Sequence, residues 1–335
     1  MRTRESDPTL NQGRIVSGDF RPHPLLRNAH LQTLGAALLR PLPRVEIRRE
    51  RWELPDGDFV DLGFCGAGTG PQVVLLHGLT GGFDSKYMLG LARNLSRIGW
   101  RSVMMLFRGA GPEPNRLART YHHGDTADLR ALLIRLQVAE PATPLFAVGW
   151  SLGGNVLLKY LGESGNDTPL SGAVAVCPPF QLEICAEKLR AGFSRVYQRP
   201  LLSELKSGMR RKFATMPSPI DLSRVLRTTD FFEFDDAATA PLNGFADARD
   251  YYNRSSCGNY LSRIQRPALI LHALDDPFMR PEIVPPASAL AAPVTLELSP
   301  HGGHVGFIAA DRALRPYCWL ERRIPEFLQS LTARE

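Results

Sequence analysis

The 335-residue sequence predicts an α/β fold in which a mostly parallel, doubly wound sheet is covered by helices. Short continuous apolar runs fit strands that are buried on both faces of a parallel sheet. Helix-periodic segments separate these runs, and such alternation is typical of a doubly wound sheet. One long central stretch has no strand-like run, which indicates a helical insertion into the sheet.

The N-terminal part is expected to lie outside the parallel sheet. Residues 1–20 are polar and are predicted to be loosely ordered, and the Pro- and Leu-rich residues 21–44 are predicted to wrap the domain. Together they form an N-terminal extension over 1–44. Residues 45–65 alternate in hydropathy around Pro55-Asp56-Gly57, which predicts an antiparallel hairpin.

The following segments alternate between the two kinds of element. Strands are expected at 73–76, 102–107, 145–148, 173–176, 268–271 and 294–298, and helices at 85–98, 126–138, 153–162 and 317–331. Asp125 is expected to cap the second of these helices, and Pro325 to break or kink the last one. The sheet-forming core is thus predicted over 45–177 and 266–335, with a helical cap over 178–265 between its two parts.

Composition excludes several classes of protein. Apolar residues make up 44% and charged residues 22% of the chain, as in ordinary globular proteins. The net charge of +6 comes from interleaved bases and acids, whereas a nucleic-acid-binding protein gathers its bases in a patch. The N-terminus has no apolar run, so no signal peptide is expected, and no stretch of the chain is apolar for the ~18 residues of a transmembrane helix. Five cysteines without C-x-x-C spacing favour a reducing compartment, so we expect a soluble cytoplasmic protein.

The strongest functional motif is Gly149-Trp150-Ser151-Leu152-Gly153, which lies between an apolar run and a helical segment. A serine hydroxyl is a poor nucleophile and must stand exposed beside a base. A sharp strand-to-helix turn holds it there, and small residues two positions before and after leave room for that turn. An incidental serine in a glycine-rich turn is the alternative. The flanking strand and helix favour Ser151 as a nucleophile.

A second loop is expected to supply part of an oxyanion hole. His77-Gly78-Leu79 follows the first buried run, and in folds with this kind of nucleophile turn that loop donates one backbone N–H. The residue after the nucleophile donates the other. We therefore predict Leu79 and Leu152 as the two donors. His77 itself is expected to be a buried histidine with satisfied hydrogen bonds.

An acid and a base are expected further along the chain, in the order serine, acid, histidine. Asp275 and Asp276 follow the apolar run at 268–271. Aligning Ala273 with the glycine of a G-x-x-D loop selects Asp276, and Asp275 is the alternative. The glycine-rich loop after the last strand offers His301 and His304, and the residues alone leave both open as the base.

Other polar clusters carry weaker signals. His122-His123-Gly124-Asp125 has metal-ligating residue types, but no second cluster at ligand spacing completes a site, and we expect no metal. No glycine motif opens a dinucleotide-binding unit, and no cofactor is expected. Arg108 either pairs with a carboxylate near the site or is solvated. His23 and His30 are expected to have structural roles.

With these residues identified, the chain resembles the YheT-like (AB-hydrolase-4) group of α/β-hydrolases, which includes eukaryotic ABHD-type lipases. The matching stretches are Asn28-Ala-His-Leu-Gln-Thr33, Leu54-Pro-Asp-Gly-Asp-Phe59, Leu76-His-Gly-Leu79, Phe107-Arg-Gly109, Gly149-Trp-Ser-Leu-Gly-Gly-Asn155, Asp275-Asp-Pro277 and His301-Gly-Gly-His-Val-Gly-Phe307. The resemblance implies an α/β-hydrolase fold with a cap. It also implies ester hydrolysis by Ser151, Asp276 and His304, and thereby favours His304 over His301.

The expected partner is therefore a small-molecule ester with an apolar acyl group. By analogy with the eukaryotic members, a lipid ester and contact with a membrane surface stay open as alternatives. Acyl transfer by the same triad and a non-catalytic binding protein of this fold are rival functions. The sequence makes no prediction of oligomeric state.

Overall fold

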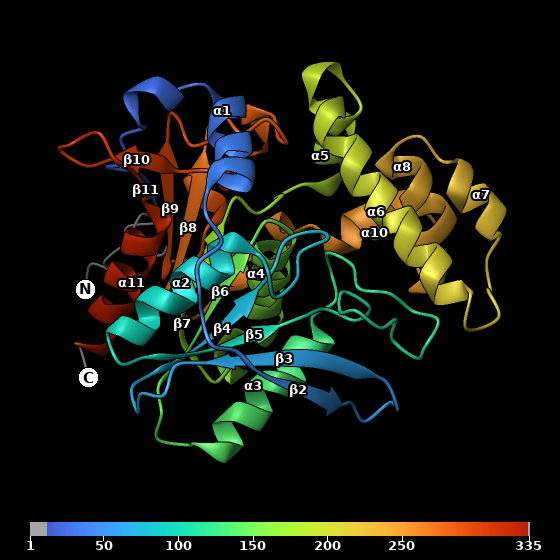
Figure 1. The fold of residues 1–335 in the computed structure, drawn as a ribbon, viewed down its shortest axis with the longest axis horizontal. Coiled ribbons are helices and arrows are strands. Elements are labelled where there is room, and N and C mark those ends of the chain that lie inside the picture. Colours follow the sequence, from blue (N-terminus) through green and yellow to red (C-terminus); the bar gives the residue numbers. More distant parts are fainter. Residues whose placement is uncertain (1–11, 334–335) are drawn as a thin grey trace, which may run out of the picture.

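The computed structural model describes residues 12–333, and within them nine strands form one sheet in the order β1-β9-β8-β7-β6-β4-β5-β3-β2 (Figure 1). The strands are β1 (Arg14–Ser17), β2 (Arg48–Glu53), β3 (Phe59–Cys65), β4 (Gln72–Leu76), β5 (Arg101–Met105), β6 (Leu145–Trp150), β7 (Leu170–Val176), β8 (Ala268–Ala273) and β9 (Val294–Ser299). From β1 to β5 along this order every pairing is parallel, and β3 and β2 join in antiparallel fashion. The predicted α/β fold and hairpin are confirmed.

Helices cover both faces of the sheet. They are α2 (Lys86–Arg97), α3 (Ala127–Ala139), α4 (Leu152–Ser164) and α11 (Leu320–Thr332). Helix α2 contacts α11 and α3 contacts α4, so that one pair lies on each face. The central strands β4, β6 and β8 are buried along their whole length. Their continuous apolar runs are therefore explained by burial on both sides.

The N-terminal segment is more ordered than its polarity predicts. Residues 14–17 form β1, which pairs in parallel with β9 at the edge of the sheet. The prediction that 1–20 is loosely ordered is therefore wrong for these residues, and 1–11 lie outside the described residues. After β1 the chain forms helix α1 (Ala29–Leu34), which Asn28 begins by accepting hydrogen bonds from His30 N and Leu31 N. This helix leads toward the histidine loop of the candidate site.

Two helix ends differ from prediction. Thr126, not Asp125, is the N-cap residue of α3, because the Asp125 carboxylate is buried and accepts a hydrogen bond from Arg119 instead. Helix α11 runs through Pro325 without a break. Pro325 has no backbone N–H to donate to the Glu321 carbonyl one turn earlier. That carbonyl instead accepts a hydrogen bond of 3.2 Å from the Asn94 side chain.

The start of the last helix also differs. Residues 316–318, partly assigned to that helix from the sequence, form β11 (Pro316–Cys318), which pairs with β10 (Ile308–Ala310). This small hairpin directly follows the histidine loop. The helix therefore begins three residues later than predicted, at Leu320.

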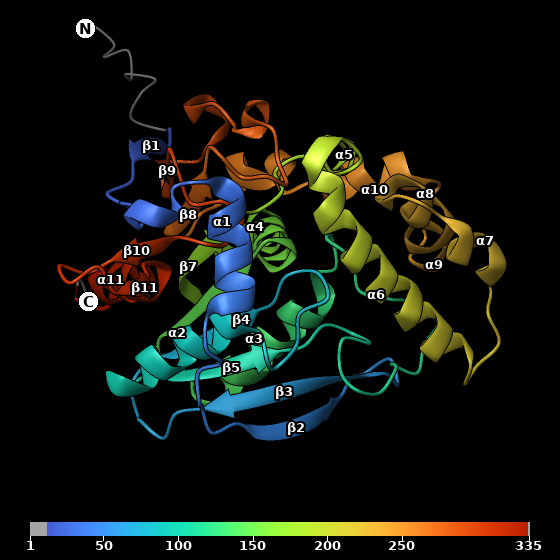
Figure 2. The same cartoon turned by 45° about the horizontal axis from the view of Figure 1, so that its top comes forward.

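Helices fill the chain between β7 and β8 and lie to one side of the sheet (Figures 1 and 2). They are α5 (Leu182–Leu189), α6 (Arg195–Phe213), α7 (Leu222–Arg227), α8 (Phe231–Phe234), α9 (Ala240–Leu242) and α10 (Ala248–Ser255). Most of their buried apolar residues form a cluster of their own. Cys185 of α5 and the later residues Cys257, Leu261 and Ile264 pack into the cluster of the sheet instead. The division of the chain into a core and a separate cap stays a prediction.

Arg108 connects the hairpin to the helical layer. Its side chain is only 3% exposed. Nε and Nη2 each donate to the Asp128 carboxylate at 2.6 Å, and Nη1 donates to Asp58 at 3.0 Å. Asp58 also accepts a hydrogen bond of 2.7 Å from the Asn115 amide. The first of the two alternatives for Arg108, pairing with carboxylates, is the one observed.

Removal of Arg108 should strongly destabilise the fold. Arg108→Met leaves Asp58 and Asp128 buried without their shared cation, and breaking a buried ion pair in this way costs about 3–5 kcal/mol of unfolding free energy. Urea denaturation followed by circular dichroism measures this loss. Arg97→Met is the matched control: Arg97 is exposed at the end of α2, and its replacement should change the unfolding free energy by no more than ~0.5 kcal/mol. Equal stability of the two variants would contradict this account of Arg108.

Candidate active site

Ser151 occupies a sharp turn between β6 and α4. Its backbone has φ of 50° and ψ of −114°, a conformation that side-chain-bearing residues rarely adopt. The Ser151 N–H donates to Val176 O of the neighbouring strand at 2.8 Å, which helps to hold the turn. The side chain therefore stands at the carboxyl end of the sheet, at the N-terminus of α4.

The two glycines of the motif are required by close backbone approach. A Cβ atom at Gly153 would lie 2.4 Å from Leu76 O, and one at Gly149 would lie 2.3 Å from Gly153 O. Both contacts are shorter than any real Cβ contact and involve backbone atoms that have no room to move. The motif thus packs strand β6, helix α4 and the end of β4 against one another with no space for side chains.

The structure brings the three predicted triad residues into one chain of hydrogen bonds. His304 Nε2 lies 3.0 Å from Ser151 Oγ, and His304 Nδ1 lies 2.8 Å from Asp276 Oδ2. The Phe278 N–H donates to the other carboxylate oxygen, Asp276 Oδ1, at 2.8 Å. Because Nδ1 faces a carboxylate, it carries the proton, which leaves Nε2 free to accept one from the serine.

Two contacts outside the triad fix the histidine ring. The Phe278 ring is stacked on the His304 ring at a centroid distance of 4.0 Å and an interplanar angle of 7°. The His304 backbone N–H donates to Thr33 Oγ1 of α1 at 2.9 Å. Sequence reasoning did not find a role for either residue, although Thr33 ends the stretch Asn28–Thr33 that carries the family resemblance.

Asp276 is electrostatically suited to be an ionised partner. Burial by itself raises the pKa of the Asp276 carboxyl, but the neighbouring His304, His272 and the Phe278 N–H together outweigh burial and hold this pKa below its usual value. The carboxylate therefore stays charged at neutral pH. A charged carboxylate at Nδ1 orients the imidazole and stabilises its protonated form.

The alternative acid and base pair with each other instead. His301 Nδ1 lies 3.4 Å from Asp275 Oδ2, and the Gly303 N–H donates to Asp275 Oδ1 at 2.9 Å. Neither residue is hydrogen-bonded to Ser151, and burial raises the pKa of the Asp275 carboxyl. Asp275 thus shapes the histidine loop, which passes close to it.

In the loop after β4, the backbone N–H of Leu79 lies between two backbone N–H groups that donate hydrogen bonds to tyrosines. The Gly78 N–H donates to the Tyr87 hydroxyl at 2.9 Å, and the Thr80 N–H donates to the Tyr121 hydroxyl at 3.1 Å. Neither Leu79 N nor Leu152 N has a hydrogen-bond partner within residues 12–333. Both predicted oxyanion donors are therefore available to a ligand, and the two tyrosines, which no sequence motif indicated, fix the loop around one of them.

His77 has the structural role expected of it. The ring is completely buried, with Nδ1 2.7 Å from Gly78 O and Nε2 accepting a hydrogen bond from Phe107 N at 3.1 Å. Burial lowers the pKa of this histidine to about 4, so the ring is neutral. The ring thereby connects the loop after β4 to the residues that follow β5. His23 and His30, likewise expected to be structural, hydrogen-bond Leu25 N and the Tyr197 hydroxyl respectively.

Asn155, in the first turn of α4, ties the nucleophile helix to the helices beside it. Its side-chain amide donates to His123 O and to Ser255 O, each at 2.7 Å. Its oxygen accepts a hydrogen bond from Cys257 N at 2.9 Å. Both polar atoms of this buried side chain thereby have hydrogen-bond partners. The hydrogen bond to His123 O also links the part of the pocket wall that contains His123 to the helix that begins after Ser151.

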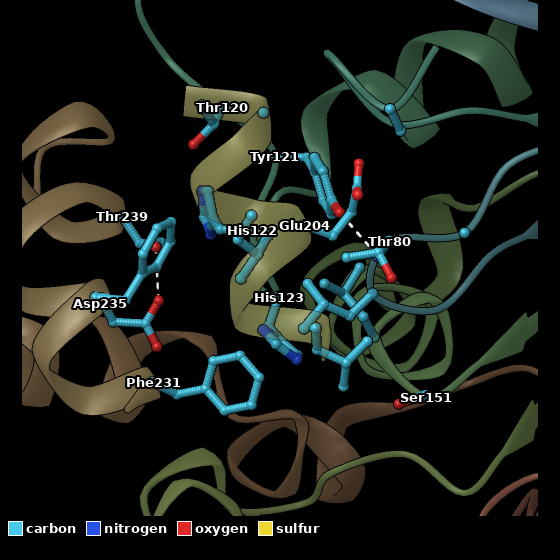
Figure 3. A pocket seen from close by; sticks show the side chains of 18 of the residues that line it. Thr80, Thr120, Tyr121, His122, His123, Ser151, Glu204, Phe231, Asp235 and Thr239 are labelled. Atoms are coloured by element: carbon cyan, nitrogen blue, oxygen red, sulfur yellow. Dashed lines mark hydrogen bonds between the residues drawn. The ribbon is translucent and has the colours of Figure 1, made fainter. Parts of the chain in front are cut away.

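A pocket opens in front of Ser151 and extends between the sheet and the inserted helices (Figure 3). Its apolar wall comes from α5, α6 and α8 and includes Leu182, Leu189, Leu205, Met209, Phe231 and Phe234. Polar side chains also line it, among them Lys212 and the pair Asp235 and Thr239, which Figure 3 shows away from Ser151. The lining suits a mostly apolar ligand whose reacting group lies next to the serine.

One group of potential metal ligands lies at this site. The one group of three close potential ligands in residues 12–333 is Cys177, Asp276 and His304, whose ligand atoms lie within 4.8 Å of one another. Burial raises the pKa of the Cys177 thiol well above its usual value, and Asp276 adds to this, so the sulfur keeps its proton. His122, His123 and Asp125 do not converge on such a site.

No helix in 12–333 is long and apolar enough to span a membrane.

Comparison with known proteins agrees with this fold. Residues 71–311 match the family described as the alpha/beta hydrolase fold, and the chain belongs to that family. It is 45% identical to the YheT protein of Escherichia coli K12 over 93% of each chain, which places it in the YheT-like group. It is 30% identical to mouse phospholipase ABHD3, covering 90% of this chain and 76% of that one. The fold also resembles Pyrococcus furiosus esterase Pf2001, with a TM-score of 0.53 and 18% identity over 95% and 98% of the two chains.

A methyl group at Gly153 tests whether the turn depends on close packing. Gly153→Ala should lower the unfolding free energy by about 1–3 kcal/mol, because the new Cβ must displace the end of β4. It should also slow the labelling of Ser151 by a fluorophosphonate, since the serine would lose its position. Gly208→Ala in α6 is the control for stability, because a Cβ there makes only an ordinary contact of 3.9 Å with the Arg211 guanidinium, and the helix should gain ~0.5–1 kcal/mol. Unchanged stability and labelling in Gly153→Ala would show that the packing is not needed.

Proposed function

We propose that the protein is a serine hydrolase that cleaves carboxylic esters through Ser151, Asp276 and His304. The observation that carries this proposal is the unbroken hydrogen-bond chain from the Asp276 carboxylate through His304 to Ser151 Oγ, at the base of a pocket. The names of two relatives support the proposal. Mouse ABHD3 is named a phospholipase, and E. coli YheT is named as an esterase by similarity.

The first half of the reaction forms an acyl-enzyme. Ser151 Oγ attacks the ester carbonyl carbon while His304 Nε2 takes its proton, and Asp276 stabilises the imidazolium that results. The carbonyl oxygen becomes an oxyanion that accepts hydrogen bonds from Leu79 N and Leu152 N. One such donor contributes about 3 kcal/mol to transition-state stabilisation. The N-terminal end of α4 adds a favourable dipole.

The second half releases the acid. The His304 imidazolium gives its proton to the leaving alkoxide as the C–O bond breaks, and the alcohol departs. A water molecule then attacks the acyl carbonyl while His304 Nε2 takes a proton from it. Collapse of the second oxyanion intermediate breaks the bond to Ser151 Oγ, which recovers its proton from His304. The apolar wall of the pocket favours esters with an apolar acyl chain.

Two neighbouring aspartates give a sharp test of the triad. Asp276→Asn should lower kcat for a p-nitrophenyl ester by about 10⁴-fold, because the amide no longer holds His304 in the correct tautomer. Asp275→Asn should change kcat by only a few-fold, since Asp275 contacts the loop and not the catalytic nitrogen. Ser151→Ala should remove activity apart from a trace that the oxyanion donors supply. A chain-length series of p-nitrophenyl esters measures all three variants and the acyl preference.

The outcomes separate the proposed residues from their alternatives. If Asp275→Asn were the inactive variant and Asp276→Asn the active one, the acid would be Asp275. If Ser151→Ala kept full hydrolysis and full labelling by a fluorophosphonate, the protein would not be a serine hydrolase of this kind. Circular dichroism of each variant excludes unfolding as the cause of a loss.

A further inference from the structure

The strongest unexplained feature of the pocket is a carboxylate in its wall. Asp235 begins a short π-helical turn, Asp235–Thr239, that joins α8 to α9. In Figure 3 its side chain points into the pocket from the side away from Ser151, next to Phe231. The proposed triad makes no use of this residue.

The Asp235 carboxylate has hydrogen-bond donors but no cation. Its oxygens accept one hydrogen bond each, from Thr239 Oγ1 at 2.6 Å and from the Tyr252 hydroxyl at 2.7 Å. The neighbouring acids Asp230 and Asp236 are paired with Arg190 and Arg224 respectively. Within residues 12–333 no basic side chain lies within 4.0 Å of Asp235. Its two acidic neighbours are thus neutralised from within the protein, and Asp235 is not.

The other titratable groups around this part of the pocket supply no positive charge. His122 and His123 line the same pocket, but burial lowers the pKa of each to about 3, so both rings are neutral. Burial also raises the pKa of the Asp235 carboxyl to about 7, and the charge of Asp230 adds to this effect. A cationic ligand would favour the ionised form of Asp235 and replace the missing counter-charge.

Basic residues elsewhere in the pocket are already engaged. Arg108 is bound to Asp128 and Asp58, and Lys212 Nζ donates to the Asn115 carbonyl at 3.1 Å and to the Asn115 side-chain oxygen at 2.6 Å. Lys212 Nζ also donates to the Leu117 carbonyl at 2.5 Å. These side chains are therefore held away from Asp235 by their own partners.

Aromatic rings line the pocket around the carboxylate. Phe231, Phe234, Tyr251 and Tyr252 all contribute to the wall, and all four side chains are largely buried. The faces of such rings attract cations, and this attraction is strongest where water is excluded. An uncompensated carboxylate among aromatic rings is the arrangement that recognises an ammonium group. A neutral hydroxyl would gain only one further hydrogen bond to an already bonded carboxylate.

We propose that Asp235 and the surrounding aromatic rings form a subsite for a positively charged ammonium group on the substrate, at the end away from the scissile ester. The inference rests on the proposed function, because it takes the same pocket as the substrate site. It assigns the protein an amphiphilic ester with an apolar segment and one ammonium group.

Binding of small amphiphiles tests the subsite without catalysis. In the Ser151→Ala protein, calorimetry should show that n-hexylammonium binds at least about tenfold more tightly than 1-hexanol, because a close charge pair in a poorly hydrated site contributes more than a neutral hydrogen bond. Asp235→Asn in this background should remove that difference. Asp236→Asn is the matched control, because Asp236 is paired with Arg224 and does not line the pocket. It should leave the difference intact.

Two further measurements keep the result interpretable. Phe231→Leu should weaken n-hexylammonium more than 1-hexanol, which supplies a second variant if Asp235→Asn folds poorly. With Ser151 present, Asp236→Asn should hydrolyse neutral p-nitrophenyl butyrate within about threefold of the parent protein, because Asp236 does not line the pocket. Failure of the parent protein to hydrolyse any ester would contradict the proposed function, whereas the calorimetric difference would still support the subsite.

The subsite would be overturned by specific results. Equal binding of n-hexylammonium and 1-hexanol, or tighter binding of 1-hexanol, would show that the carboxyl is neutral and serves only Thr239 and Tyr252. An unchanged preference in a folded Asp235→Asn protein would place the ammonium group elsewhere. Loss of preference in Asp236→Asn as well would indicate a general effect of charge and not this site.

Discussion

Close backbone packing at the end of the central strands is the constraint on which the rest of this structure depends. Gly149 and Gly153 allow β6, α4 and the end of β4 to pack closely. At each of these glycines a Cβ atom would collide with a backbone carbonyl oxygen of the neighbouring segment. This packing forces Ser151 into its unusual backbone conformation at the N-terminus of α4. It also brings the loop after β4 next to the serine: a Cβ at Gly78 would lie 3.5 Å from Ser151 Cβ. The same contacts thus set the positions of the proposed nucleophile and of one proposed oxyanion donor.

The other parts of the site reach this point from distant regions of the chain. The loops after β8 and β9 bring Asp276 and His304, since parallel strands end at one edge of the sheet. Helix α1 contributes Thr33 to the histidine loop from nearly the opposite end of the sequence. The helices between β7 and β8 then close the pocket above the serine. They give it an apolar wall that contains one carboxylate without a counter-charge, so that the pocket is shaped for a particular kind of amphiphile.

Much of the fold was predictable because burial leaves a direct trace in sequence. Strands such as β4 and β6 are buried on both faces, and their continuous apolar runs predicted them. Strand β1 was missed because it lies at the sheet edge, with all four residues exposed, and pairs through its backbone. The choice between Asp275 and Asp276 likewise depends on backbone geometry: one carboxylate reaches the histidine ring, and the other accepts the Gly303 N–H. The roles of Tyr87 and Tyr121 depend on tertiary contacts, which no local pattern encodes.

The central claim is that the Ser151 hydroxyl, activated by this packing and by His304, forms the covalent bond to the substrate. The most direct measurement is peptide mapping by tandem mass spectrometry after reaction of the folded protein with a fluorophosphonate. The account predicts one adduct per chain, located on Ser151, with loss of hydrolysis in proportion to its formation. An adduct on another residue that accompanies the loss, or full hydrolysis by protein whose Ser151 is completely modified, would contradict it.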